Sequence, residues 1–576
     1  MSDYTLTKEG YFRDGEQLTN FSATIDRQLK KHDGKKSETF LEISGKIGED
    51  DYPTITVAAT DFGKFDWIAR SWGMMPVIYP LPNVERDLKA AMQTLSEPEM
   101  LDLYIHTGWT QIDNQDMYLH GGGAISKKGN NPDVNVELPH DLRHYTLDPV
   151  AKVTSRGAFR ASLNLSTIGP PEIMWSLLLA TYRAAIGETD FAVHLSGKTG
   201  TFKSEVCSLM QSHYGEKMDA RHLPGNWSST PNAIECQCYR AKDALIVIDD
   251  YVPTGTSWQV RGLNKTMDQI IRGQGNQAGR ARLTDTSNLQ TTMYPRGLIM
   301  STGEDVPSGQ SIRARLLICD LAPGDIDPKK LTIAQNLRSS YPVAMRGWIQ
   351  HLSGDLKKIR DGMEKISTEY RDTHRDLGHA RTPQMIGELK ATLEALISYG
   401  MRNEFITPDE ASRLVGSGLA SLEKQGREQM NYLRDTEPSD VFLEILRYVL
   451  SAHLGHLRSK SGGIPDGPGE LGWTAQASTS SGVQKWKASG PTIGWLDPDK
   501  EEIYIDQNQF PFIQKHAGGK LNMSRQTLLK RMKDAAILSR TDDLRNRNTM
   551  RVMLGGSQRT VITMAQSQVF PEDDKK

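Results

Sequence analysis

A segment whose residue types suit phosphate binding lies near residue 200. An apolar run ends in a glycine-rich loop, and a Lys-Ser pair then opens a stretch with helical spacing. In the pattern G-x-x-x-x-G-K-[ST], loop N–H groups hold phosphates, the lysine reaches the β and γ oxygens, and the hydroxyl binds Mg²⁺. The pattern predicts ATP and Mg²⁺ as ligands. The phosphate-binding residues it selects are Gly197, Lys198, Thr199, Gly200, Thr201, Phe202, Lys203 and Ser204.

One position of this loop departs from the pattern. Phe202 stands where the second glycine is expected, and this costs conformational freedom beside the phosphates. A shifted frame, with Lys198 and Thr199 as the Lys-Thr pair, would place Ala192 at the first glycine, inside the strand. The frame with Lys203 is the stronger prediction, and the shifted frame stays open.

A second run with suitable chemistry follows about 40 residues later. Residues 244–248 are apolar and rich in β-branched types, and they end in Asp249 and Asp250. A buried parallel strand would deliver these acids to the carboxyl edge of its sheet. We expect Asp249 to hold Mg²⁺ and Asp250 to polarise the attacking water. Such a run is otherwise a strand that meets a polar loop, but its spacing from the phosphate loop favours the metal site.

Composition indicates an ordinary soluble protein of several domains. The chain has 576 residues, of which 37% are hydrophobic and 24% charged, with a formal net charge of −2. Any nucleic-acid binding must therefore come from local patches. No apolar run is long enough to cross a membrane, and the first residues lack the features of a signal peptide, so we expect a cytoplasmic protein without a membrane partner. Four cysteines fit no disulfide framework.

Strands alternate with helices around the candidate loop, which predicts an α/β fold with a parallel sheet. Further strands are expected at 297–300 and 316–321. We divide the chain into an N-terminal α+β domain (1–150), a P-loop ATPase core resembling the AAA+ class (165–330), a helical domain (331–460) and a basic C-terminal domain (470–568). A Gly- and Pro-rich stretch at 461–469 reads as a linker.

The C-terminal domain has the outline of a winged helix. A helix-like run at 524–534 precedes two strand-like runs, 549–554 and 559–564. Ten Lys or Arg stand against three Asp or Glu between 520 and 560. A helix with a basic hairpin would bind duplex DNA, with Lys530 and Arg531 as contacts. The alternative is a basic surface that contacts protein or only solvent.

Seven segments in this order resemble a bacterial family of helicase-like P-loop ATPases, once catalogued as a domain of unknown function. Its members occur on phages and mobile elements, and its cassette-chromosome helicases resemble hexameric replicative helicases of the minichromosome-maintenance class. The segments are 107–109, 119–125, 197–204, 227–235, 248–250, 301–304 and 313–316.

The resemblance implies roles for further residues. Ser301 and Thr302 occupy the strand tip where ring ATPases keep a residue that orients the attacking water. Arg315 matches an arginine finger that reaches the ATP of the neighbouring subunit, with Arg313 as the second choice. Otherwise an Arg pair beside a strand is a surface or salt-bridged feature.

The resemblance also suggests a DNA-gripping loop. Residues 272–282 are Gly-rich and basic, and in ring helicases the loop in this interval points into the central pore. Arg280 and Arg282 would grip single-stranded DNA through its backbone charges. The alternative is a mobile surface loop.

These features favour an ATP-dependent DNA helicase or translocase, a homo-hexamer that holds single-stranded DNA in its pore and duplex DNA at its C-terminal domain. The alternative is a regulatory ATPase, such as an initiator, loader or defence component, that changes a DNA or protein complex without unwinding.

Overall fold

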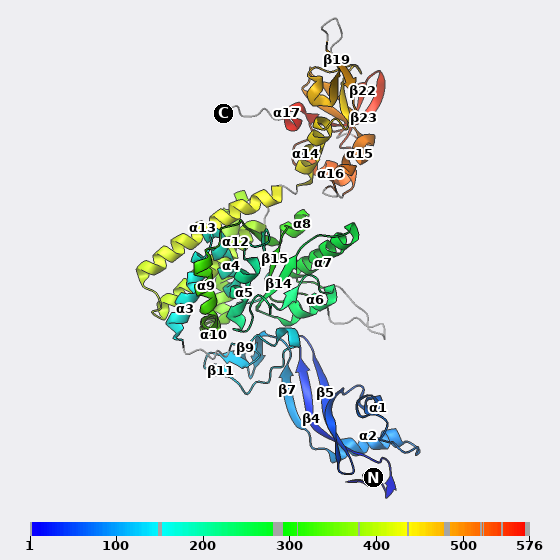
Figure 1. The fold of residues 1–576 in the computed structure, drawn as a ribbon, viewed down its shortest axis with the longest axis vertical. Helices are drawn as coiled ribbons and strands as arrows, with labels where there is room; N and C mark the ends of the chain where they lie inside the picture. Colours follow the sequence, from blue (N-terminus) through cyan, green and yellow to red (C-terminus); the bar gives the residue numbers. More distant parts are fainter. Residues whose placement is uncertain are drawn as a thin grey trace. The chain divides into compact units, whose positions relative to one another are not determined.

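The computed structural model divides the chain into two compact units. The first comprises Met1–Val306 and Arg315–Arg427, and the second Pro307–Ala314 and Glu428–Lys576. The structure describes residues 3–147, 153–279, 292–307, 309–377, 381–434, 437–476, 484–518, 521, 523–542, 545 and 547–570. Within them, no helix combines the length and apolar character needed to cross a bilayer. Figure 1 follows the elements along the chain.

The N-terminal part of the first unit contains three sheets and two α-helices, and neighbouring strands in these sheets are antiparallel except for the parallel pair β4 and β7. One four-stranded sheet has the order β6-β5-β4-β7, and another has the order β11-β10-β9-β8. Buried and more exposed residues alternate along much of β4, as expected for a strand with one face on a core. The elements are β1 Tyr4–Thr7, β2 Gly10–Arg13, β3 Glu16–Gln17, β4 Ser22–His32, β5 Ser37–Ile47, β6 Asp50–Ala58, α1 Asp66–Trp72, α2 Val84–Leu95, β7 Glu99–Tyr104, β8 Gly108–Ile112, β9 Gln115–His120, β10 Gly123–Ser126 and β11 Gly129–Asn131.

A parallel five-stranded sheet forms the centre of the first unit, which confirms the predicted α/β class. Its order is β13-β14-β15-β12-β16, and every pair is parallel. All residues of β12 and β15 are buried, as expected where both faces of a sheet are covered. The elements are α3 Ser155–Asn164, α4 Pro171–Ala184, β12 Ala192–Gly197, α5 Lys203–Gln211, β13 Gly225–Asn226, α6 Pro231–Arg240, β14 Leu245–Tyr251, α7 Ser257–Asn276, β15 Leu298–Gly303 and β16 Leu316–Leu321.

Long helices follow the sheet, as the sequence predicts. Arg183 of α4 and Glu388 of α12 form a 3.0 Å ion pair with both side chains largely buried, which ties a helix of this section to the core. Burial raises the pKa of Glu388. The helices are α9 Pro328–Asn336, α10 Tyr341–Leu352, α11 Leu356–Thr373, α12 Arg381–Arg402 and α13 Pro408–Arg434.

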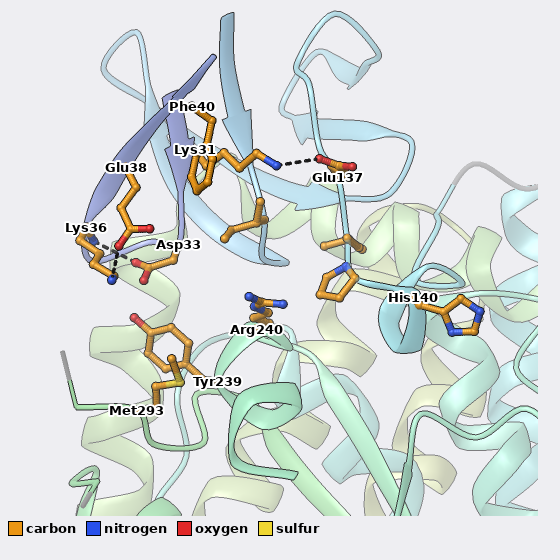
Figure 2. A pocket seen from close by; sticks show the side chains of 13 residues that line it. Lys31, Asp33, Lys36, Glu38, Phe40, Glu137, His140, Tyr239, Arg240 and Met293 are labelled. Carbon is orange, nitrogen blue, oxygen red and sulfur yellow. Dashed lines mark hydrogen bonds and ion pairs between the residues drawn. The ribbon is translucent and has the colours of Figure 1, made fainter. Parts of the chain in front are cut away.

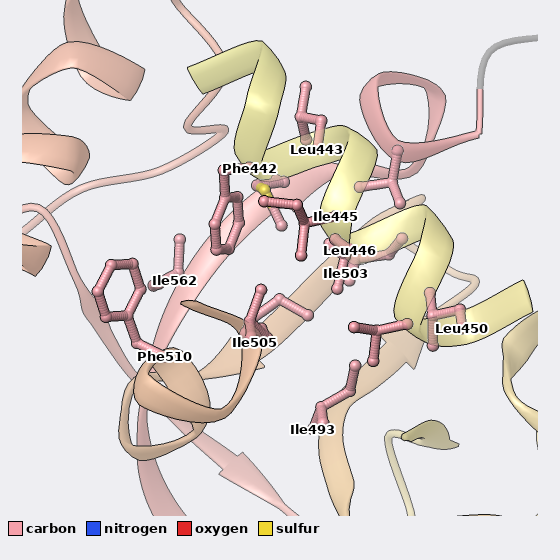
Figure 3. Close-up of a cluster of buried hydrophobic side chains, with 14 of the residues drawn as sticks. Phe442, Leu443, Ile445, Leu446, Leu450, Ile493, Ile503, Ile505, Phe510 and Ile562 are labelled. Carbon is pink, nitrogen blue, oxygen red and sulfur yellow. The ribbon is translucent and has the colours of Figure 1, made fainter. Parts of the chain in front are cut away.

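The second unit has its own core and a five-stranded sheet of order β17-β20-β21-β23-β22. Figure 3 shows α14 lying over the buried side chains of this sheet. The predicted helix and hairpin are present as α16, β22 and β23, although β23 also pairs with β21 inside the larger sheet. The elements are α8 Gln310–Arg313, α14 Pro438–Ser451, β17 His456–Ser459, β18 Trp473–Gln476, β19 Lys485–Ala488, β20 Thr492–Asp497, β21 Glu502–Asp506, α15 Phe510–Lys515, α16 Arg525–Asp534, β22 Met550–Leu554, β23 Ser557–Ala565 and α17 Gln566–Val569.

The predicted linker at 461–469 is wrong. Leu457 and Leu471, on either side of it, belong to the same hydrophobic core. The segment is therefore a loop within the second unit, and its Gly and Pro content reflects turns, not a boundary. The four-domain division stays a prediction.

Candidate phosphate-binding site

The glycine-rich loop leaves the carboxyl end of β12 and ends where α5 begins. Gly197 has φ 149°, and a Cβ there would lie 2.5 Å from the carbonyl oxygen of Leu321, so only glycine fits. Gly200 also has a positive φ of 87°. The first N–H groups of a helix have no intrahelical partner. The start of α5 therefore offers such groups beside the loop.

Phe202 adopts the conformation that the expected glycine would provide. Its φ and ψ are 64° and 20°, in the left-handed region, and its side chain is 42% exposed. An L-residue with a side chain pays about 1–2 kcal/mol in this region. The departure from the pattern therefore lowers stability at this position.

Lys203 lies over the loop. Its Nζ donates hydrogen bonds to the carbonyl oxygens of Gly197, at 2.7 Å, and Lys198, at 2.9 Å. Lys198 itself is exposed, and Ala192 is buried at the start of β12. The geometry favours the frame with Lys203 over the shifted frame.

Three strands and α5 bring Ser204, Asp249 and Thr302 together. Ser204 Oγ donates to Asp249 Oδ1 at 2.8 Å, and the Thr302 hydroxyl donates to the same oxygen. The sheet order explains this meeting, because β15 lies between β12 and β14 and the carboxyl ends of parallel strands share one edge. The predicted pair Ser204 and Asp249 is thus assembled on one edge.

Asp250 lies at an irregularity of β14, directly after Asp249. The register with β15 shifts between Ile248 and Tyr251, and Asp250 has φ 69°. Its backbone N–H donates to Thr302 Oγ1 at 3.1 Å, and the residue is exposed. A β-bulge re-aims a side chain in this way. Asp249, before the bulge, is half-buried, whereas Asp250 is exposed to solvent.

Ser301 does not join this group. Its Oγ accepts a hydrogen bond from Trp227 Nε1 at 2.8 Å and lies 3.0 Å from His194 Nδ1, in a fully buried position. Successive residues of a strand face opposite sides, so Thr302 faces Asp249 while Ser301 does not. Of the two predicted residues, Ser301 and Thr302, the geometry therefore favours only Thr302 for a role beside Asp249 and Asp250.

The sequence reasoning assigned no role to Glu304. The Thr199 hydroxyl donates to its carboxylate, which links the tip of β15 to the phosphate loop. Glu304 was visible as part of the segment 301–304, but a link across 105 residues has no local signal.

Arg315 lies at the opposite edge of the sheet. The N–H of Ala192, the first residue of β12, donates to the Arg315 carbonyl at 2.9 Å, whereas Gly197 pairs with Leu321. Five residues of strand, about 16 Å, separate these ends. The Arg315 guanidinium donates to Asn276 at 2.9 Å, and burial followed by the charges of neighbouring arginines lowers its pKa.

Arg313 belongs to the second unit. Its guanidinium donates to the carbonyl oxygens of Pro307 and Tyr432 at 2.9 and 3.0 Å. These bonds hold the side chain against backbone of its own unit.

The predicted pore loop is described only in part. Arg280 and Arg282 lie outside the described residues. The beginning of the predicted loop, 272–276, is the last part of α7, so a loop starting at 272 is wrong. Gln274 explains this, because its buried amide donates to Thr189 Oγ1 and to the carbonyls of Phe191 and Gly297, each at 2.9 Å.

Lys530 and Arg531, the two residues predicted to contact duplex DNA, differ in their surroundings. Lys530 is exposed on α16, whereas Arg531 Nη1 donates to Gln310 Oε1 at 2.6 Å and lies 3.8 Å from Glu437 Oε1. Lys530 is therefore free to meet a polyanion, while Arg531 is engaged within its unit.

The oxygen atoms beside the loop suit Mg²⁺. Ser204 Oγ and Asp249 Oδ1 are hard oxygen ligands, and Mg²⁺ is commonly held by one or two such groups together with substrate phosphates. Among the described residues, no three His, Cys, Asp or Glu side chains gather as a metal cage. The site fits a metal that binds together with a phosphate.

Comparison with known proteins gives two matches. A family model described as "Domain of unknown function (DUF927)" matches residues 172–286. A solved structure named "SCCmec type IV Cch - active helicase" superposes with a TM-score of 0.55 at 12% sequence identity, covering 98% of each chain. At this identity the likeness shows a shared fold. No curated protein has significant sequence similarity to this chain. The family model covers the part of the chain that holds the loop 197–204 and the Asp249 strand.

Proposed function

We propose that this protein is an ATP-dependent DNA helicase or translocase of phage or mobile-element replication. The observation that carries the proposal is the joining of the Lys203 loop to Asp249 and Thr302 through Ser204 at one edge of a parallel sheet. In this proposal one nucleotide contacts Lys203 with its phosphates and meets Ser204, Asp249 and Thr302 at the same edge, and the three contacts of these residues support it. The solved helicase of the same fold supports the choice of reaction.

Each residue has a role in this proposal. The loop 197–204 holds the phosphates of ATP, with Lys203 neutralising the β and γ oxygens. Ser204 and Asp249 hold Mg²⁺, which when bound offsets the charge of the phosphates. Asp250 polarises the attacking water, and Thr302 fixes the two acids relative to each other.

The place of Arg315 supports the proposal of a ring. It lies about 16 Å of strand away from the loop of its own chain, so as an arginine finger it would serve a neighbouring chain. We therefore propose a homo-hexamer in which Arg315 acts in trans. Arg313, whose guanidinium is bonded to two carbonyls of the second unit, is the weaker candidate.

DNA would be held at two places. Arg280 and Arg282 remain the proposed contacts to single-stranded DNA in the pore. The region of α16, β22 and β23 is proposed as a winged helix for duplex DNA, with Lys530 as its most accessible candidate and Arg531 as a supporting residue.

A regulatory ATPase remains the second candidate, because Asp250 is a short, exposed carboxylate on a bulge. Such a base predicts slow hydrolysis, which suits a switch better than a motor.

The decisive experiment measures ATP turnover and unwinding of a forked DNA, with native mass measurement in the same buffer. Lys203→Ala should lower turnover by at least about 100-fold, as expected for loss of a charged group at the phosphates. Lys198→Ala removes the exposed lysine of the shifted frame and should retain turnover, and loss of turnover in Lys198→Ala with turnover kept in Lys203→Ala would favour the shifted frame. ATP turnover without unwinding or oligomers would favour the regulatory ATPase, and equal turnover in wild type and Lys203→Ala would reject this site.

A further inference from the structure

Trp258, near the start of α7, differs from every other tryptophan of the chain in its exposure. The residue is 82% exposed, whereas eight of the ten tryptophans are buried and Trp486 is half-buried. A tryptophan side chain is large and mostly apolar, and it usually packs into a core or an interface. An indole that a helix presents to solvent therefore indicates a binding surface.

Two cations share one side of α7 with this indole. Arg261 and Lys265 follow Trp258 by three and seven residues, which places all three within about 60° of one another around the helix. Both are exposed, and among the described residues neither side chain has a hydrogen bond or an ion pair. No Asp or Glu occurs between Tyr251 and Met267. Trp258, Arg261 and Lys265, here called the α7 face, thus form an aromatic surface with positive charge only.

Two lysines elsewhere in the first unit provide a contrast. They line a cavity of about 470 Å³ between the turn of the β4–β5 hairpin, the segment 137–140 and the end of α6 (Figure 2). Lys31 Nζ lies 3.5 Å from a carboxylate oxygen of Glu137, and Lys36 Nζ lies 2.5 Å from one of Glu38. Those charges are neutralised within the protein, whereas the charges of the α7 face are available to an anionic ligand.

The α7 face is open, and its helix is fixed in position. Apart from its chain neighbours, no side chain lies within 4 Å of the point that a Cβ of Gly262 would occupy, so the surface one turn after the indole is uncovered. A capping box joins Thr256 and Gln259 at the start of α7, and the Tyr251 hydroxyl of β14 donates to Asn264 Oδ1 at 2.5 Å. A planar group therefore has room to lie against the indole without a change in the helix.

We propose that the α7 face binds single-stranded DNA, with a base stacked on Trp258 and phosphates bound by Arg261 and Lys265. Stacking on an aromatic side chain, together with cations along the backbone, holds a single strand without reading its sequence. Trp258 and Lys265 are about 10 Å apart along the helix axis, which is the rise of about three stacked nucleotides. The inference rests on the proposed function, and it adds a contact to those proposed at Arg280 and Arg282.

Anisotropy titrations of two labelled strands with the full chain test the proposal: an oligothymidylate and an abasic strand of the same length. The wild type should bind the oligothymidylate about tenfold more tightly, because only this strand has bases to stack. Trp258→Ala should remove most of that preference, and Trp258→Phe should restore part of it. The double variant Arg261→Gln and Lys265→Gln should weaken binding of both strands. It should also reduce the slope of log affinity against log salt by about 1.4, the value for two phosphate contacts.

Two exposed residues of the first unit that lie outside α7 provide matched controls. Met74→Ala removes an exposed apolar side chain and Lys329→Gln an exposed charge, and both variants should bind the strands as the wild type does. An equal preference for the oligothymidylate in wild type and folded Trp258→Ala would overturn the proposal, and so would a wild type that binds neither strand.

Native mass measurement of the same variants distinguishes DNA from a protein partner. A Trp258→Ala variant with a changed oligomeric mass and unchanged affinity for both strands would assign the α7 face to a subunit contact and overturn the proposal. Unwinding is a separate readout. A chain that binds DNA through the α7 face and leaves a forked DNA paired would contradict the proposed helicase and support this inference.

Discussion

At the scale of single residues, Thr302 makes two contacts that a neighbouring hydroxyl cannot replace. Its hydroxyl donates to Asp249 and accepts the N–H of Asp250, whereas Ser301 is bonded to Trp227 and lies beside His194. Thr302→Val keeps the shape of the side chain and removes both contacts. We expect kcat for ATP to fall by about 10- to 100-fold, which corresponds to one or two lost hydrogen bonds.

Ser301→Ala provides the contrast for this prediction. It removes a fully buried hydroxyl, leaves Trp227 Nε1 without its acceptor, and should lower the free energy of unfolding by about 1–3 kcal/mol. Its kcat should change less than that of Thr302→Val. A larger kcat effect in a folded Ser301→Ala variant would reverse the assignment of the two residues.

Substitutions of Phe202 measure how much stability is lost when a residue with a side chain adopts the left-handed backbone conformation in the phosphate loop. Phe202→Gly should leave stability equal or slightly higher, because relief of about 1–2 kcal/mol of strain is opposed by the greater chain entropy of glycine. Phe202→Val should lower stability by about 1–2 kcal/mol, since a β-branched residue suits φ 64° poorly. Thermal melting of both variants measures the difference, and a Val variant as stable as wild type would contradict this loop conformation.

The residues of the candidate site that follow a local pattern could be proposed from the sequence. Lys203, Ser204 and Asp249 are set by their spacing along two strand ends, and the structure brings Ser204 and Asp249 into contact. The choice between Ser301 and Thr302 could not be made, because it depends on which face of β15 each side chain takes. Glu304 was not assigned for a related reason, since its partner Thr199 is distant in the chain.

At the scale of elements, α16 presents two adjacent cations in different roles. Lys530→Gln removes an exposed charge and should reduce the salt dependence of duplex binding by about one phosphate contact. Arg531→Gln breaks the bond to Gln310 and should lower the melting temperature of the second unit more than Lys530→Gln does. Binding titrations at several salt concentrations, with melting curves, distinguish the two. Identical salt slopes for Lys530→Gln and wild type would remove Lys530 from the DNA surface.

The place of Arg315 at an edge of the central sheet leads to a prediction about the ATP turnover of mixed subunits. Arg315→Ala subunits, which keep Lys203, should regain part of their ATP turnover when mixed with Lys203→Ala subunits, which keep Arg315. Arg272→Gln, whose paired guanidinium lies in the same basic group, serves as a control and should retain turnover by itself. Mixed oligomers that form normally and stay inactive would contradict a finger acting in trans.

Four strands of the central sheet could be predicted from the sequence, whereas the end of α7 could not. The strands of the central sheet are continuous apolar runs, so β12, β14, β15 and β16 could be placed from sequence. The end of α7 was mistaken for a loop because its glycines disfavour a helix by about 1 kcal/mol each. Long-range bonds of Gln274 outweigh that penalty, and Gly275 is required where the Arg315 side chain packs.

At the scale of the whole molecule, buried histidines make stability depend on pH. Burial lowers the pKa of both His106 and His213 from 6.5 to about 4. The unfolded chain therefore binds protons more readily than the folded chain below pH 6.5, and stability is lost as pH falls toward 4. Each histidine contributes up to about 1.4 kcal/mol per pH unit in this window.

Melting temperatures measured between pH 4.5 and 7 check this expectation. His213→Gln should reduce the dependence on pH below 6.5, because the remaining slope then comes from His106 and the carboxylates. Above pH 6.5 the two proteins should show parallel curves. An unchanged slope in His213→Gln would mean that His213 is already protonated in the folded state.

The segment 307–314 has a consequence for the gene as well as for the protein. The chain passes between the units after Val306, after Ala314 and after Arg427, so part of the second unit is encoded inside the core. Recombination at a single point cannot add or remove this unit as an intact module. An exchange near codon 428 would separate residues 307–314, which include the buried Ile312 and Ala314, from the rest of the second unit. Arg313 would then lose its hydrogen bond to the Tyr432 carbonyl. The two units are therefore expected to be inherited together.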